Sequence, residues 1–296
     1  MSLTVAQLAE FIENGAVTVR TPLSDEELRR CGQAMKAAAP QREGATRTGR
    51  TCDYYHPEIL HVVVHPWLES VAKQTLSTDA VTLFQTALLN AWPDAAADRR
   101  TDLQQMDGYH TDMQYTYEDL HATPRRMQVS FFLWVSNVPL GRANLMFRPG
   151  THRMMAQAWS RRPGELGDLT PRIVGKNWRA DDFPSEVLQA LPPAQPVVAT
   201  AGDVTVLTTG AVHSASPNFT DGTRQCLVIT FTPANVEVGL PPNQAEAKRA
   251  YDVGLRQRLP PDRQHIVAGP SNGENNPYGR HYYCKWLESV QQAPRL

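Results

Sequence analysis

The feature that most constrains the fold is a series of short β-strand patterns in the middle of the chain. Met127–Val135 alternates between residue classes along its length, and turn pairs such as Pro149-Gly150 and Gly202-Asp203 separate neighbouring patterns. Several short strands divided by turn signals predict a sandwich or a barrel. The expected strands are Val81–Asn90, Met127–Val135, Ala143–Phe147, Val197–Ala199, Val204–Leu207 and Cys226–Phe231.

Helical patterns lie on both sides of these strands. Apolar spacing predicts a helix over residues 4–14 that Thr4 caps, and Ala16–Arg20 is expected to be a strand. Ser24 and Glu27 form a capping box for a second helix that runs to about residue 39. Another helix is expected to open at Pro57 or Pro66 and reach about residue 76, and a last one over 245–259. Helices followed by strands favour an antiparallel, double-layered sheet.

Two polar segments are expected to cover a site. Residues 40–56 and the insertion 151–196 carry no strand pattern, and long loops inside compact domains are usually functional or disordered. We therefore expect one domain over 1–296, with a helical scaffold at about 1–79, a β core at about 80–235 that includes the insertion, and a C-terminal extension over 236–296. The insertion and the polar segment are the predicted lid pieces.

Composition excludes several classes of function. The 296 residues carry a formal net charge of −1, which gives no electrostatic argument for nucleic acid binding. No apolar stretch approaches the roughly 20 residues that span a bilayer. The four cysteines form no Cys-x-x-Cys pair, so neither a zinc site nor a disulfide framework is indicated. A cytoplasmic protein is expected, and the sequence is compatible with a homodimer.

The candidate chemistry begins at Gly108-Tyr-His-Thr-Asp112. Side chains two residues apart on a strand point to one face, so His110 and Asp112 can converge on one metal ion. A second histidine from a distant strand completes a two-histidine, one-carboxylate facial triad, which is typical of non-heme Fe(II) oxygenases. His213 is the candidate. Each residue alone also has an ordinary structural explanation, a buried core histidine in the case of His213.

Arg224 follows His213 by eleven residues, at the start of the last expected strand. A fixed guanidinium can hold a carboxylate through two charge-assisted hydrogen bonds. 2-Oxoglutarate requires such an anchor at its far carboxylate while its keto-acid end chelates iron. Taken alone, an arginine is more often a surface or ion-pair residue.

These pieces together resemble the phytanoyl-CoA dioxygenase family of Fe(II)/2-oxoglutarate oxygenases. The matching segments fall in the family's order over about residues 8–235: Phe11–Val19 with the Leu23–Leu28 helix start, His110-Thr-Asp112, Phe147–His152, Ala201–Asp203, and His213–Asn218 with Arg224. Thr111 departs from the family, which often has Gln there.

The resemblance implies a fold and a set of roles. The fold would be mainly β with flanking helices, around a double-stranded β-helix (jelly-roll, cupin-like) core. His110, Asp112 and His213 would be the catalytic iron ligands, Arg224 would bind 2-oxoglutarate, and a strand residue would assist it. Gln104 is the assisting residue we select; Gln85, Thr82 and Asn90 are the others considered. The cofactors would be Fe(II) and 2-oxoglutarate, with O2 as cosubstrate.

The expected function is a dioxygenase that hydroxylates a small organic substrate, plausibly in secondary metabolism, and releases succinate and CO2. Two alternatives stay open. One is a cupin-type metalloenzyme that does not use 2-oxoglutarate, against which Arg224 argues. The other is a non-catalytic binding protein on the same fold, against which the complete ligand set argues.

Overall fold

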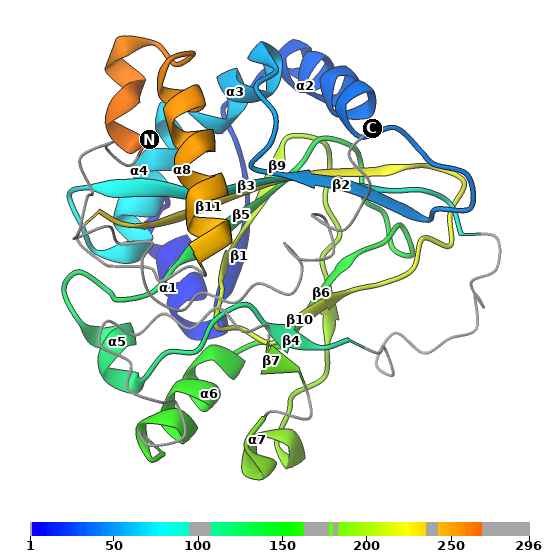
Figure 1. Ribbon diagram of the computed structural model, residues 1–296. Helices are drawn as coiled ribbons and strands as arrows, with labels where there is room; N and C mark the ends of the chain where they lie inside the picture. Colours follow the sequence, from blue (N-terminus) through cyan, green and yellow to red (C-terminus); the bar gives the residue numbers. More distant parts are fainter. Residues whose placement is uncertain (1, 95–107, 163–177, 180–182, 235–241, 268–296) are drawn as a thin grey trace.

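The computed structural model describes residues 2–94, 108–162, 178–179, 183–234 and 242–267. Eleven strands form two sheets in this part of the chain (Figure 1). The larger sheet has the order β1-β9-β5-β11-β3-β2, and the smaller one has the order β7-β4-β10-β6-β8. Every strand pairing is antiparallel.

The strands of the larger sheet are β1 (Ala16–Arg20), β2 (Arg47–Thr51), β3 (Val81–Ala91), β5 (Val129–Trp134), β9 (Asp203–Thr208) and β11 (Arg224–Pro233). Those of the smaller sheet are β4 (His110–Thr111), β6 (Leu145–Phe147), β7 (Trp178–Arg179), β8 (Gln195–Pro196) and β10 (His213–Ala215). The chain passes repeatedly from one sheet to the other, as β9, β10 and β11 illustrate. Two facing antiparallel sheets wound in this way are a double-stranded β-helix, which confirms the predicted fold class.

The helices are α1 (Val5–Asn14), α2 (Asp25–Ala38), α3 (Pro57–Val63), α4 (Pro66–Leu76), α5 (Tyr117–His121), α6 (Thr151–Ser160), α7 (Ser185–Gln189), α8 (Pro242–Arg256) and the 3-10 helix Pro261–Ile266. Figure 1 shows α2, α3, α4 and α8 beside the larger sheet and α5, α6 and α7 near the smaller one. In the described part of the chain, no helix is long and apolar enough to cross a membrane.

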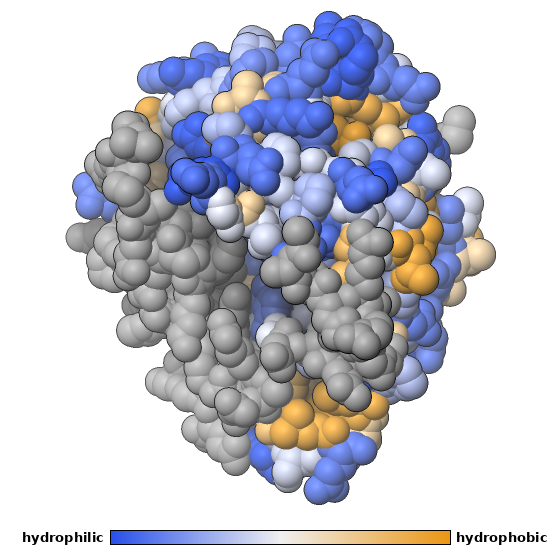
Figure 2. All heavy atoms as spheres, turned by 90° about the vertical axis from the view of Figure 1, so that its right-hand side faces the viewer, coloured by the Kyte–Doolittle hydropathy of each residue, from blue (hydrophilic) through white to orange (hydrophobic). Residues whose placement is uncertain are grey.

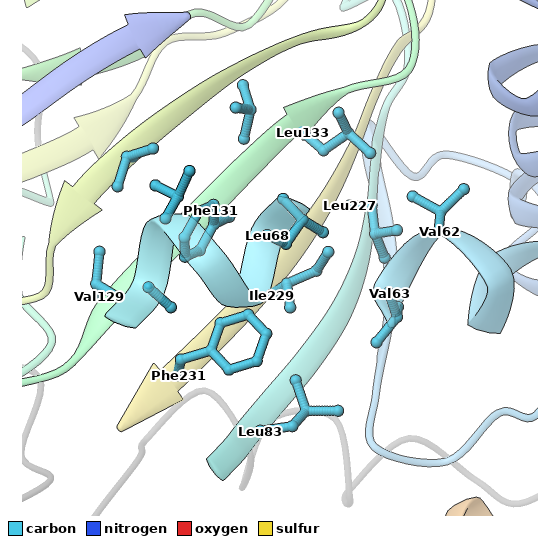
Figure 3. Packing of buried hydrophobic residues seen from close by; sticks show 14 of the residues in the cluster. Val62, Val63, Leu68, Leu83, Val129, Phe131, Leu133, Leu227, Ile229 and Phe231 are labelled. Carbon is cyan, nitrogen blue, oxygen red and sulfur yellow. The ribbon is translucent and has the colours of Figure 1, made fainter. Parts of the chain in front are cut away.

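Side chains of the larger sheet alternate between two apolar layers. Phe131, Ile229 and Phe231 point to the outer face, where they pack with Leu68 of α4 (Figure 3). Phe132 and Val228 point to the inner face, toward the smaller sheet. Every residue of β5 and β11 is buried, because both faces of these central strands are covered. Truncating a side chain such as Phe131 to Ala is expected to cost roughly 3–5 kcal/mol.

The predicted helix caps are confirmed. Thr4 and Gln7 form a capping box at α1, and Ser24 and Glu27 form one at α2. Each box satisfies backbone N–H groups that the first helical turn leaves without partners. Gly15 ends α1 in the left-handed conformation, and β1 follows directly, which attaches this helix to the edge of the larger sheet.

Four sequence predictions were wrong in part. The one helix expected to open at Pro57 or Pro66 is two helices, α3 and α4, separated at residues 64–65. Residues 40–56 contain strand β2, a polar edge strand whose pairing with β3 determines its conformation although its sequence lacks a strand pattern. The insertion 151–196 includes helices α6 and α7 and two short strands. The strand expected at Val197–Ala199 lies at Gln195–Pro196, and Ala199 makes only an isolated bridge to Val138. The predicted features at 269–287 lie outside the described residues.

Candidate active site

The three candidate ligands converge between the sheets. His110 lies on β4, Asp112 follows it directly, and His213 opens β10, where it pairs with His110. The His110 Nε2 atom is 3.6 Å from Asp112 Oδ1, and His213 Nε2 is 3.8 Å from Asp112 Oδ2. One ligand atom from each residue lies within 4.8 Å of the other two. The antiparallel pairing of two very short strands therefore brings together residues about one hundred positions apart.

Hydrogen bonds on the far side of each ring fix the orientation of both imidazoles. His110 Nδ1 donates to the Gly108 carbonyl and His213 Nδ1 donates to the Ala211 carbonyl, each at 2.9 Å. A carbonyl can only accept, so Nδ1 of each ring donates, and Nε2 is the ring nitrogen directed toward Asp112 and available to a metal ion. This is the usual environment of histidines that bind metal ions. Gly108 has a φ of 86°, a left-handed conformation that glycine adopts without strain.

The donor set fits one divalent ion. Two neutral imidazole nitrogens and one carboxylate oxygen form the facial set that suits Fe(II) and leaves the other coordination positions open. His213 is buried, whereas His110 and Asp112 remain about one quarter exposed, so small molecules can approach from their side. Figure 2, viewed from the right-hand side of Figure 1, shows hydrophilic side chains over much of the upper part of this face.

Arg224 opens β11 and points to the inner face, opposite Ala91 of β3. It is 5% exposed, and its Nε atom is buried without a hydrogen-bond partner. Burial, with a smaller contribution from Arg47, lowers the pKa of its guanidinium. Arg47 faces Ala91 from the other side, but it donates to the carbonyls of Ala215 and Ser216. Arg47 therefore has carbonyl acceptors, whereas the Nε atom of Arg224 has none among the described residues.

The structure places the residues considered as assistants of Arg224 differently, where it describes them. Gln104 lies outside the described residues, so its role stays a prediction. Asn90 turns to the outer face and donates to the carbonyls of Met35 and Ala39, which removes it from the site. Gln85 and Thr82 are half-buried and pair with Thr230 and Thr232 of β11.

Sequence reasoning missed a group of polar residues on the same inner wall. Gln128 and Ser130 alternate with the outward-facing Val129, and Thr230 lies opposite Ser130. All three polar side chains are buried. Their alternation with apolar residues in Met127–Val135 is the signal that could have identified them, because it places them on the face that Phe132 shares.

A family model described as "Phytanoyl-CoA dioxygenase (PhyH)" matches residues 11–226. The chain belongs to this family, and it is therefore an Fe(II)- and 2-oxoglutarate-dependent oxygenase. The match covers the segment that contains β1 to the first residues of β11, including all three candidate ligands. No curated protein sequence matches the chain.

Solved structures share the fold. The non-heme α-ketoglutarate-dependent carbocyclase SnoK from nogalamycin biosynthesis is 18% identical, with a TM-score of 0.56 over 80% of this chain and 86% of that one. The epimerase SnoN in complex with Fe3+, α-ketoglutarate and nogalamycin RO is 18% identical, with a TM-score of 0.57 over 79% and 84%. HygX from Streptomyces hygroscopicus with nickel, 2-oxoglutarate and hygromycin B is 13% identical, with a TM-score of 0.55 over 80% and 91%.

Proposed function

We propose that His110, Asp112 and His213 bind a single Fe(II) ion and that Arg224 binds the far carboxylate of 2-oxoglutarate. The observation that carries this proposal is the combination of a converged donor set with a buried guanidinium on the facing sheet whose Nε atom has no hydrogen-bond partner. A buried charge without a partner is costly, and a carboxylate is the ligand that would compensate it. With these cofactors bound, the reaction consumes O2 and 2-oxoglutarate and yields succinate, CO2 and an oxidised substrate.

The protein's own residues position the reactants and exclude water. The inner wall between the donor set and Arg224 is apolar, with Phe132, Trp134 and Val228 facing the smaller sheet. The Phe132 ring meets the His213 ring edge-on at 6.3 Å between centroids. An apolar wall strengthens the contact between Arg224 and a carboxylate by lowering the local dielectric. It also limits reactions of the oxidant with solvent.

We propose hydroxylation of a small organic molecule, plausibly in secondary metabolism, as the outcome. Asp112 occupies the position that a smaller residue would leave open to a halide, so the ligand set favours oxygen transfer over halogenation. Of the relatives, SnoK is a carbocyclase and SnoN an epimerase, which shows that this fold supports other outcomes. Their association with nogalamycin, and that of HygX with hygromycin B, supports the choice of secondary metabolism.

The two alternatives make different use of the same residues. A cupin-type metalloenzyme that does not use 2-oxoglutarate would have no need for the buried Arg224. A non-catalytic binding protein would have no need for two imidazoles oriented with their Nε2 atoms toward one carboxylate. A cytoplasmic location, a homodimer and the single-domain organisation stay predictions.

The test is turnover of 2-oxoglutarate under isotopically labelled O2. Purified protein with Fe(II), ascorbate and 2-oxoglutarate should produce succinate that carries one labelled oxygen atom, and the His213→Ala variant should produce none. The control variant is His61→Ala, because His61 is an exposed helix residue paired with Glu27. Metal binding without any 2-oxoglutarate consumption would favour the cupin-type alternative and overturn the proposal.

A further inference from the structure

The polarity of the inner face of the larger sheet changes along the strands. Arg224 lies at one end, and an apolar zone formed by Cys226, Val228 and Phe132 follows it. A band of neutral polar residues comes next, and we call it the polar band: Gln85, Gln128, Ser130, Thr230 and Thr232. Thr230 lies between Gln85 and Ser130 in the strand register, and Thr232 and Gln128 continue the band toward the strand ends.

The polar band has unused hydrogen-bonding capacity. Gln128 is 1% exposed, and both its amide nitrogen and its amide oxygen are buried without a partner. The Thr232 hydroxyl is likewise buried without a partner. Ser130 and Thr230 bond to each other at 2.8 Å. Buried polar groups are nearly always hydrogen-bonded, so several unsatisfied groups on one wall indicate a ligand that satisfies them.

The polar band lies on the opposite side of the donor set from Arg224. Phe132, which contacts His213, pairs with Val228. Arg224 is four residues from Val228 in one direction, about 13 Å along the strand. Thr230 is two residues away in the other direction, about 7 Å. Cosubstrate held by Arg224 would fill the first side, which leaves the polar band to the substrate.

The charges on this wall restrict the chemistry of that substrate. Among the inner-face residues of β3, β5 and β11, Arg224 is the only charged side chain. The polar band offers amide and hydroxyl groups, which both donate and accept. Such groups suit hydroxyls and other neutral polar groups. On the described inner faces of these three strands, a carboxylate or a phosphate would find no cation beside the polar band, and a hydrocarbon chain would leave Gln128 unsatisfied.

We propose that the polar band is the substrate-recognition surface and that the substrate presents a neutral, hydroxyl-rich portion to it, as a glycoside or a polyol would. Gln128 supplies a donor and an acceptor, and Thr230 with Ser130 supplies hydroxyls on the side of Phe132 away from Arg224. This inference rests on the proposed function and adds the substrate class to it.

The test begins with the anaerobic complex of wild-type protein with Fe(II) and 2-oxoglutarate, whose visible absorption band changes when substrate displaces water from iron. Two sets of probes are added: neutral compounds (a disaccharide, a cyclitol and a polyketide glycoside) and contrasting compounds (a fatty acyl thioester, an amino acid and a sugar phosphate). The inference predicts that only neutral, hydroxyl-rich compounds change the band and accelerate succinate formation. A response confined to the contrasting set, or none from any neutral compound, would overturn it.

Variants then locate the binding surface. Gln128→Leu and Thr230→Val should each lower the affinity for the compound that gave a response roughly tenfold, while the affinity for 2-oxoglutarate stays unchanged. The matched control is Thr205→Val on the same inner face, because the Thr205 hydroxyl already bonds Trp134 and Thr18. This control should lower thermal stability without changing affinity for the compound. Unchanged affinity in both test variants would refute the assignment.

Different results would contradict the proposed function and the proposed substrate class. If wild-type protein shows no band with Fe(II) and 2-oxoglutarate, the proposed function fails. If the band forms but responds to anionic or acyl compounds instead, only the substrate class fails. Near-UV circular dichroism of each variant shows whether its fold is intact, and Thr230→Val serves as the second, nearly isosteric change should Gln128→Leu disturb packing.

Discussion

Replacing Arg224 by Gln removes the only inner-face charge on the three central strands while keeping a polar side chain of similar length. Hydrogen bonds to a charged group contribute about 1.5–3 kcal/mol each to stability or binding. Losing one such contact to 2-oxoglutarate should raise its Kd roughly 10- to 150-fold. Iron binding should be unchanged, because Arg224 belongs to a different strand from the three ligands.

Ligand-dependent thermal stability measures this effect under anaerobic conditions with Fe(II) present. At a 2-oxoglutarate concentration of 100 times the wild-type Kd, binding stabilises the native state by about 2.7 kcal/mol. A variant that binds 100-fold more weakly gains only about 0.4 kcal/mol at the same concentration. The Arg224→Gln protein should therefore lose most of the increase in Tm that 2-oxoglutarate gives the wild type.

The same substitution predicts an unusual result without ligand. Arg224 is buried and its Nε has no partner, so its removal should not lower the Tm of the ligand-free protein. The control is Arg263→Gln, because Arg263 is half-buried, pairs with Glu69 at 2.7 Å and donates to the Val64 carbonyl. That variant should be less stable without ligand and keep the full response to 2-oxoglutarate. An unchanged response in Arg224→Gln would refute the assignment of Arg224 as the anchor.

Three further predictions concern the ligands and one distant ion-pair cluster. His213→Ala and Asp112→Ala should abolish Fe(II) binding in anaerobic titration calorimetry, and full binding by either would contradict the ligand assignment. Gly108→Ala should lower the affinity for Fe(II) roughly tenfold. An alanine in the left-handed conformation costs about 1–2 kcal/mol, and relieving this strain displaces the carbonyl that orients His110. Gly44→Ala is its control, because Gly44 also has a positive φ and open space for a Cβ atom but is far from the three ligands in sequence. Burial raises the pKa of Glu69, but hydrogen bonds from Lys73, His265 and Arg263 outweigh it and leave the pKa at about 2. Its stabilisation is therefore present above the ordinary value of 4.5 and lost as the pH falls toward 2, so wild type should lose more stability than Glu69→Gln over this range in urea unfolding. Parallel curves would show that this cluster contributes nothing.

The sequence predicts the β-helix core well because its strands alternate and its turns carry glycine and proline. It also predicts α1 and α2, whose capping boxes are local signals. Strand β2 could not be predicted, since Arg47–Thr51 has no apolar alternation and becomes a strand only by pairing with β3. The sequence analysis expected one helix that begins at either Pro57 or Pro66. Each proline in fact begins a helix of its own, so the boundary between Val63 and Pro66 was missed.

In the site too, features that depend on neighbouring residues could be predicted from the sequence, and features that depend on distant segments could not. His110 and Asp112 are neighbours in sequence, so their shared direction follows from strand geometry alone. The pairing of His213 with His110 joins two strands of the smaller sheet that are far apart in sequence, so strand geometry alone does not predict it, and the resemblance to a family supported the choice of His213. Asn90 was a reasonable candidate by residue type, but the parity of its strand position turns it toward α2. Of the polar band, only Gln85 was considered from the sequence, because the members of the band come from different segments of the chain that the sheet brings together.

The most direct test of the central claim is an anaerobic titration of purified, metal-free protein with Fe(II) and 2-oxoglutarate, monitored by visible absorption. A keto acid that chelates ferrous iron at an open facial site gives a weak charge-transfer band. The account predicts that this band appears in the wild type with one Fe(II) per chain and is absent in His213→Ala. Iron binding without the band, or a band that persists without His213, would contradict it.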